Sequence, residues 1–149
     1  MKPFLTWTAA LALSGTALLA DTVPTGQPLT TILANVEKGG YRDVTEVSVD
    51  DGEWEVEALR DGQPVGLRIV PATGEIRSVH ADEPHPALPK EALSLPEILK
   101  KLEAAGYTQV SKLELEPAGW EVECWKGGSE RDLLIDVRTG QVLSDRADD

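Results

Sequence analysis

The amino-acid sequence predicts an α+β protein of two tandem repeats, each with one helix packed on a three- to four-stranded antiparallel sheet. The chain aligns with itself at an offset of 66 residues, which places the tetrapeptide WEVE at Trp54–Glu57 onto a second WEVE at Trp120–Glu123. In both copies the spacing of apolar residues changes from a helical period to the alternation typical of strands. The predicted boundaries are 21–82 for the first repeat, 83–93 for a Pro-rich linker and 94–149 for the second repeat.

Residues 1–20 are predicted to be a secretory signal peptide that precedes the fold. Lys2 gives a small positive start, and the apolar run Phe4–Ala20 leads to the acidic Asp21. A transmembrane anchor is the alternative, but a membrane-spanning helix needs about 20 strongly apolar residues, and this run contains Thr, Ser and Gly. We therefore expect a periplasmic or secreted protein that begins near Asp21, with the cleavage site left open.

Each copy begins with a predicted helix, over 29–37 and over 95–103. The apolar stripe follows the i, i+3, i+4, i+7 spacing of an amphipathic helix and consists of Leu29, Ile32, Leu33 and Val36, then Leu95, Ile98, Leu99 and Leu102. Ser94 and Glu97 have the spacing of a capping box at the start of the second helix. Gly40 and Gly106 follow the two helices and are suited to end them.

The WEVE segments are predicted to be the central strands of the two sheets. Alternation puts Trp54, Val56 and Ala58 on one face of the first strand, and Trp120, Val122 and Cys124 on the same face of the second. We expect this face to pack on the helix and the glutamates of WEVE to be solvated. Cys124, the only cysteine, is then a buried, inert thiol, and no internal disulfide is possible.

Composition limits the partners. The chain has 26 Asp and Glu against 14 Lys and Arg, and such a charge is repelled by nucleic acids and by anionic membranes. We therefore expect a protein partner, no nucleic acid, and no membrane association once the signal peptide is removed. The oligomeric state stays open.

The residues also indicate a protein without catalysis, cofactor or metal. The chain contains no H-E-x-x-H motif and no nucleophile elbow. A metal could in principle be collected by His80, Asp82, Glu83 and His85. We favour a solvated polar linker, because spacing within a Pro-rich loop defines no geometry. The acidic tail, including Asp145, is interpreted as a solvated end.

One long segment resembles a known domain family. The run SLPEILKKLEAAGYTQVSKLELEPAGWEVECWKGGSERDLLIDVRTGQVL is similar to a PepSY domain in its helix ending in AGY, its aromatic-E-V-E strand and its closing D-x-x-TG-x-V. The first copy matches more weakly, with Val70 where Asp136 stands in the second. The resemblance implies a non-catalytic module of the kind found in propeptides of thermolysin-like proteases and in exported proteins associated with peptidase restraint. Tandem helix-plus-sheet repeats also resemble the beta-lactamase inhibitor proteins.

The sheet face opposite the helices is the candidate functional surface. Apolar residues occur there where polar ones are expected, so they either pack the two repeats together or form a binding patch. The candidate protein-binding face comprises Leu59, Glu121, Glu123, Trp125 and Leu134. We expect a non-catalytic exported binding module that restrains or regulates a peptidase. The alternative is an acidic periplasmic cation-binding or sensor protein.

Overall fold

The computed structural model describes residues 23–148, so the predicted signal peptide lies outside the described residues. The two predicted helices are present as α1 (Leu29–Lys38) and α2 (Leu95–Ala104). Four strands follow each helix: β1 (Tyr41–Asp50), β2 (Glu53–Arg60), β3 (Gln63–Ile69) and β4 (Ile76–Ala81), then β5 (Thr108–Glu116), β6 (Gly119–Lys126), β7 (Ser129–Ile135) and β8 (Val142–Ala147).

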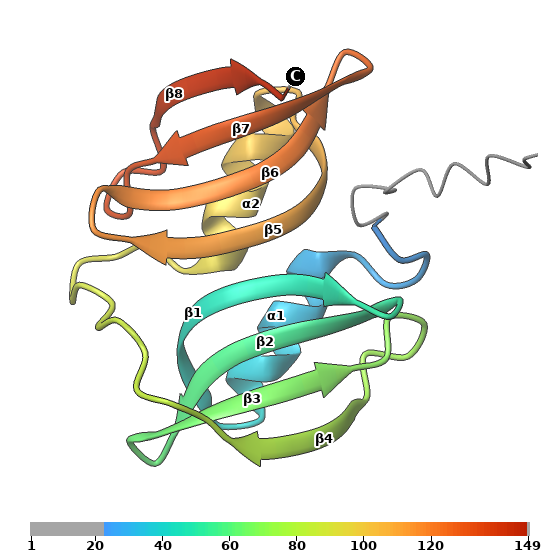
Figure 1. Ribbon diagram of the computed structural model, residues 1–149, viewed down its shortest axis with the longest axis vertical. Coiled ribbons are helices and arrows are strands. Elements are labelled where there is room, and N and C mark those ends of the chain that lie inside the picture. The colour runs from blue at the N-terminus through green and yellow to red at the C-terminus, as the bar shows by residue number, and fades with distance from the viewer. Residues whose placement is uncertain (1–22, 149) are drawn as a thin grey trace, which may run out of the picture.

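The predicted assembly of these elements into two repeats, each with its own sheet, was wrong. The eight strands form one antiparallel sheet in the order β4-β3-β2-β1-β5-β6-β7-β8. Figure 1 shows both helices behind this sheet, on the same side. The fold is therefore one sheet covered on one face by two helices.

The junction between the halves is the pairing of β1 with β5, through Glu46 with Glu114 and Val47 with Leu113. Without it, each four-stranded meander would leave a strand edge with unpaired backbone N–H and C=O groups. Joining the two edges pairs the strands at these positions and brings α1 and α2 into contact behind the sheet. The two repeats thus become one structural unit.

A single hydrophobic core lies between the sheet and the helices. Trp54 and Trp120 are 1% and 0% exposed, which confirms that the Trp face of each WEVE strand points inward. The core includes residues of both halves, with the helical stripe of each copy packed against its sheet. Within residues 23–148, no helix covers the opposite sheet face.

The helix ends follow the local sequence signals. The capping box at the start of α2 is confirmed, since the Ser94 side chain accepts a hydrogen bond from the Glu97 backbone N–H and Glu97 reaches back to Ser94. Gly40 and Gly106 have φ angles of 90° and 91°, a backbone conformation that glycine adopts without strain. The chain can therefore turn from each helix directly into the first strand of each meander.

Candidate functional site

Four glutamates lie side by side across the centre of the open face, which is the sheet face opposite the helices. Cross-strand pairing joins Glu57 to Glu46, Glu46 to Glu114 and Glu114 to Glu121, so the row crosses β2, β1, β5 and β6. Partial burial raises the pKa of Glu46, and the neighbouring Glu57 and Glu114 raise it further. Like charges in directly opposed positions disfavour folding. This row therefore gives the open face a negative potential that favours cationic groups.

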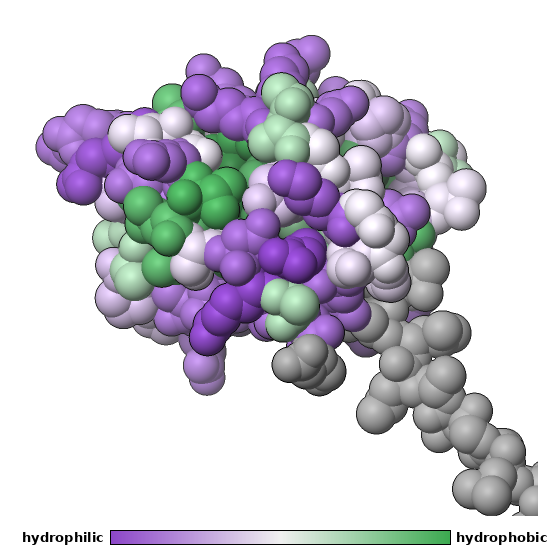
Figure 2. All heavy atoms as spheres, turned by 90° about the horizontal axis from the view of Figure 1, so that it is seen from above, coloured by the Kyte–Doolittle hydropathy of each residue, from purple (hydrophilic) through white to green (hydrophobic). Residues whose placement is uncertain are grey.

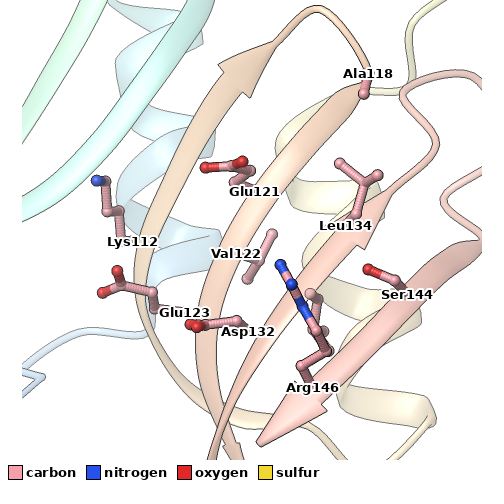
Figure 3. A pocket seen from close by; sticks show the side chains of 10 residues that line it. Lys112, Ala118, Glu121, Val122, Glu123, Asp132, Leu134, Ser144 and Arg146 are labelled. Atoms are coloured by element: carbon pink, nitrogen blue, oxygen red, sulfur yellow. The ribbon is translucent and has the colours of Figure 1, made fainter. Parts of the chain in front are cut away.

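A hollow of about 250 Å³ lies beside this row in the second half of the sheet. We call it the second-half hollow; its walls include Lys112 from β5, Glu121 and Glu123 from β6, Asp132 and Leu134 from β7, and Ser144 and Arg146 from β8. Figure 3 shows Lys112 on one side of the two glutamates, with Asp132, Leu134 and Arg146 on the other. Acidic, basic and apolar groups are thus available within one depression.

The charges in the hollow are only partly satisfied. Lys112 Nζ lies 2.9 Å from Glu114 Oε2, so this ammonium is already paired. Among residues 23–148, neither Glu123 nor Arg146 has an ion-pair partner. The Glu123 side chain is half-buried, and this burial raises the pKa of its carboxyl group. A cation placed beside Glu123 would relieve that cost.

The equivalent region of the first half is occupied by the chain itself. The 66-residue offset relates Asp132 to Gly66, Leu134 to Arg68 and Arg146 to His80. The His80 ring lies directly over Gly66, where even a Cβ atom would overlap it. Arg68 forms ion pairs with Glu55 at 2.8 Å and with Asp50. These side chains fill the space that stays open in the second half.

The linker also contributes to this covering. His85 lies with Nε2 3.1 Å from Asp82 Oδ2 and 3.6 Å from Glu57 Oε2, and its side chain is only 4% exposed. The prediction of a solvated linker was therefore wrong for His85. Leu88 and Leu93 pack against the core, and the Leu93 backbone N–H donates to the Val137 carbonyl. Glu57 is the 66-residue equivalent of Glu123. The linker therefore contacts this glutamate position in the first half, whereas in the second half the same position lines the open hollow.

The structure brings together most of the predicted binding residues, but not all of them. Glu121, Glu123 and Leu134 line the second-half hollow. Trp125 follows on the same face of β6, opposite Thr108 and Glu130, and is 38% exposed. Leu59 is paired with Arg42 and lies on β2, which β1 and β5 separate from β6. It therefore does not share a surface patch with the others.

Sequence reasoning missed the basic side of the hollow. Lys112, Ser144 and Arg146 alternate outward on strands β5 and β8, but their periodicity is also that of ordinary solvated positions. Only the sheet order places them beside the predicted glutamates.

Figure 2, which views the molecule from the end where β8 lies, shows a mainly hydrophilic surface with a compact hydrophobic patch.

Two other polar groups have structural roles. Burial raises the pKa of the Cys124 thiol to about 12, and Cys124 is 1% exposed, so it is not positioned as a nucleophile. Asp145 accepts a hydrogen bond from Tyr107 Oη at 2.7 Å and one from Arg131 Nε at 2.6 Å. Asp145 is exposed, as expected, but it is not part of an irregular end, because it lies in β8 and links this strand to β7 and to the start of the second meander.

The fold places the protein in a class of small modules in which helices pack on one antiparallel sheet and the sequence contains an internal repeat. The family described as peptidase propeptide and YPEB domain matches residues 4–80 and 81–146. The protein therefore belongs to this PepSY family, in agreement with the resemblance found in its motifs.

Two further comparisons complete this picture. Among solved structures, a candidate lipoprotein from Clostridium difficile 630 is similar with a TM-score of 0.47 and 15% sequence identity, covering 86% of this chain and 95% of that chain. No curated protein matches the chain. Within residues 23–148, neither helix has the length and apolar character needed to cross a membrane.

Proposed function

We propose that the protein is a non-catalytic exported module that binds a partner protein, an exported peptidase, through the second-half hollow and the adjacent Trp125. Membership in the peptidase propeptide and YPEB domain family supports a peptidase-related role. The observation that carries the proposal is the difference between the two halves. The hollow is open in the second half, whereas linker and strand side chains occupy its counterpart in the first.

The chemistry of the hollow favours an extended, basic segment as its occupant. In the first half, the linker crosses the open face and presents an imidazole to Glu57. The equivalent Glu123 has a raised pKa because it is partly buried, and a Lys or Arg side chain of a partner would compensate its charge. Leu134 offers an apolar contact inside the hollow. The contact of His85 with Glu57 is thus an internal example of a nitrogen-bearing side chain placed beside this glutamate position.

Trp125 is the proposed anchor of this interface. Interfaces concentrate their binding free energy in a few aromatic and Arg residues surrounded by polar groups, and Trp125 lies on the same strand face as Glu121 and Glu123. The row of glutamates on the open face would attract a basic partner over a longer distance and mainly increase the association rate. Affinity and association rate are therefore expected to depend on different residues.

The first experiment identifies the partner. A photo-crosslinking amino acid replaces Trp125 in one variant and Leu59, its 66-residue equivalent, in a second, and crosslinked proteins from the periplasmic or culture fraction are identified by mass spectrometry. We expect a peptidase to crosslink from position 125 and not from position 59. Identical products from both positions, or products without a peptidase, would contradict the proposal.

The second experiment measures affinity with the purified partner. Trp125→Ala is expected to weaken binding by about 30-fold, which corresponds to about 2 kcal/mol at an interface anchor. Leu59→Ala is the matched control and should bind as the wild type does. Glu121→Gln, which removes one charge of the glutamate row, should lower the association rate and its dependence on salt. Unchanged affinity of Trp125→Ala would exclude this face as the binding site.

A further inference from the structure

We propose that Glu57, Asp82 and His85 form a binding site for one divalent transition-metal ion, best matched by Zn²⁺, which fastens the linker to the sheet. The site lies in the first half and is separate from the second-half hollow. The inference does not depend on partner binding.

The three side chains come from different parts of the chain and converge on one point. Glu57 is on β2, Asp82 follows β4 and His85 lies in the linker, and one ligand atom from each lies within 4.8 Å of the others. His85 Nε2 is 3.1 Å from Asp82 Oδ2 and 3.6 Å from Glu57 Oε2. Tetrahedral Zn²⁺ with bonds of about 2.0–2.1 Å separates neighbouring ligand atoms by about 3.3 Å. The observed separations lie on either side of that value.

The burial of His85 is the second observation that points to a ligand. Its side chain is 96% buried, since only 4% is exposed, and its Nδ1 atom has no hydrogen-bond partner among the described residues. Nε2 is therefore the nitrogen through which the ring acts, and it faces two carboxylates. A buried imidazole directed at a pair of carboxylates has the composition of a metal site with three protein ligands.

Charge balance favours a dication at this position. The Glu83 backbone N–H donates a hydrogen bond to Asp82 Oδ1 and so orients this side chain. Two carboxylate ligands supply a charge that a divalent ion neutralises. The glutamate row beside Glu57 adds further negative potential.

The donor set selects among cations. Ca²⁺ takes six to eight oxygen ligands, and Mg²⁺ keeps an oxygen-only octahedral shell, whereas imidazole with carboxylates suits Zn²⁺. A second carboxylate group, formed by Glu114, Glu116 and Glu121, has no nitrogen ligand and is more exposed.

A metal-free alternative is a histidine that is held between the two carboxylates by hydrogen bonding alone. Both arrangements hold the linker on the sheet, so loss of stability in a His85 variant does not distinguish them. Only the metal site binds a stoichiometric ion. The experiment must therefore measure metal binding directly.

The test uses the full chain without an affinity tag, stripped of metal by a chelator and titrated with Zn²⁺ by calorimetry at pH 7.5. We expect saturable binding of one ion per chain and a higher melting temperature with Zn²⁺ present. His85→Ala and Glu57→Gln should each weaken Zn²⁺ binding by at least about tenfold, as expected for a lost ligand. His80→Ala, the matched histidine control, should bind within about threefold of the wild type, because it removes no ligand.

The opposite results would overturn the site. Absence of saturable Zn²⁺ binding, or wild-type affinity in either His85→Ala or Glu57→Gln, would leave the metal-free, hydrogen-bonded histidine as the correct description. Circular dichroism of each variant before titration verifies that the fold is retained, and the two independent ligand variants keep the test decisive if one of them unfolds.

Discussion

Val47 of β1 and Leu113 of β5 are direct cross-strand partners, and both are 0% exposed. They are also equivalent positions of the two repeats, related by the 66-residue offset. The junction of the halves is therefore the place where the chain pairs with its own copy, inside a core that both halves share. Each half is stabilised by burial against the other.

The shared junction predicts a single cooperative unfolding transition. Leu113→Ala should lower the free energy of unfolding by about 2–5 kcal/mol, the usual cost of truncating a buried leucine. Urea denaturation followed by far-UV circular dichroism and by tryptophan fluorescence should give coincident curves. Leu143→Ala, at a residue that is 51% exposed, is the control and should change little. Two separate transitions would show that the halves fold independently.

The two buried tryptophans should be equally important for stability. Trp54→Ala and Trp120→Ala should each cost about 3–5 kcal/mol, because each removes a large side chain from the core. Trp125→Ala should cost much less, since that side chain is 38% exposed. Chemical denaturation of the three variants provides the comparison. Similar losses in all three would mean that Trp125 is packed in solution.

Cys124 should resist thiol reagents in the folded protein. Its pKa of about 12, raised by burial, leaves almost no thiolate at pH 8, and the sulfur is inaccessible. Ellman's reagent should modify it only after denaturation. Ser129→Cys, which places a thiol at an exposed position in the same chain, should react at once with one equivalent in the native state. Rapid native modification of the wild type would disprove burial of Cys124.

Ionisation of Asp145 should make the free energy of unfolding depend on pH in the acidic range. Hydrogen bonds from Arg131 and Tyr107 lower its pKa in the folded state, so its ionised form contributes stability above the unfolded pKa of about 3.9. That contribution is lost as the pH falls through the lower, folded value. Asp145→Asn should therefore destabilise the protein at pH 7.

The measurement is the urea midpoint of Asp145→Asn and wild type between pH 7 and pH 2.5. The gap between them should narrow below about pH 4, because the wild-type carboxylate is protonated there as well. Glu103→Gln, an exposed substitution on α2, is the control and should follow the wild type. A gap that stays constant with pH would assign the effect to packing and not to the charge of Asp145.

The elements of this fold could be predicted because each has a local signal. The apolar stripe from Leu95 to Leu102 requires a helix, and Ser94 with Glu97 marks its start. Alternation at Trp120 and Val122 identified which face of the strand is buried, and the structure confirms it. These signals depend only on residues close together in the sequence.

The sequence predicted only those residues of the candidate site that lie together on β6. Glu121, Glu123 and Trp125 share a face because they alternate along β6, which the sequence shows directly. Arg146 and Lys112 join that site through the order of strands, and His85 reaches Glu57 from a Pro-rich segment that has no periodicity. Leu59 was included because alternation places it on the same sheet face, which does not imply proximity to Trp125.

The sequence by itself determined the duplication, the helices and strands, and the inward face of each strand, because side-chain periodicity is set within each element. Only the tertiary structure decided that β1 pairs with β5, so that two expected sheets become one. Strand edges pair through backbone N–H and C=O groups, which are the same in every residue except proline and therefore leave no pattern in the side chains. The same pairing sets Glu46 beside Glu114 and so creates the acidic row beside which the open hollow of the second half lies.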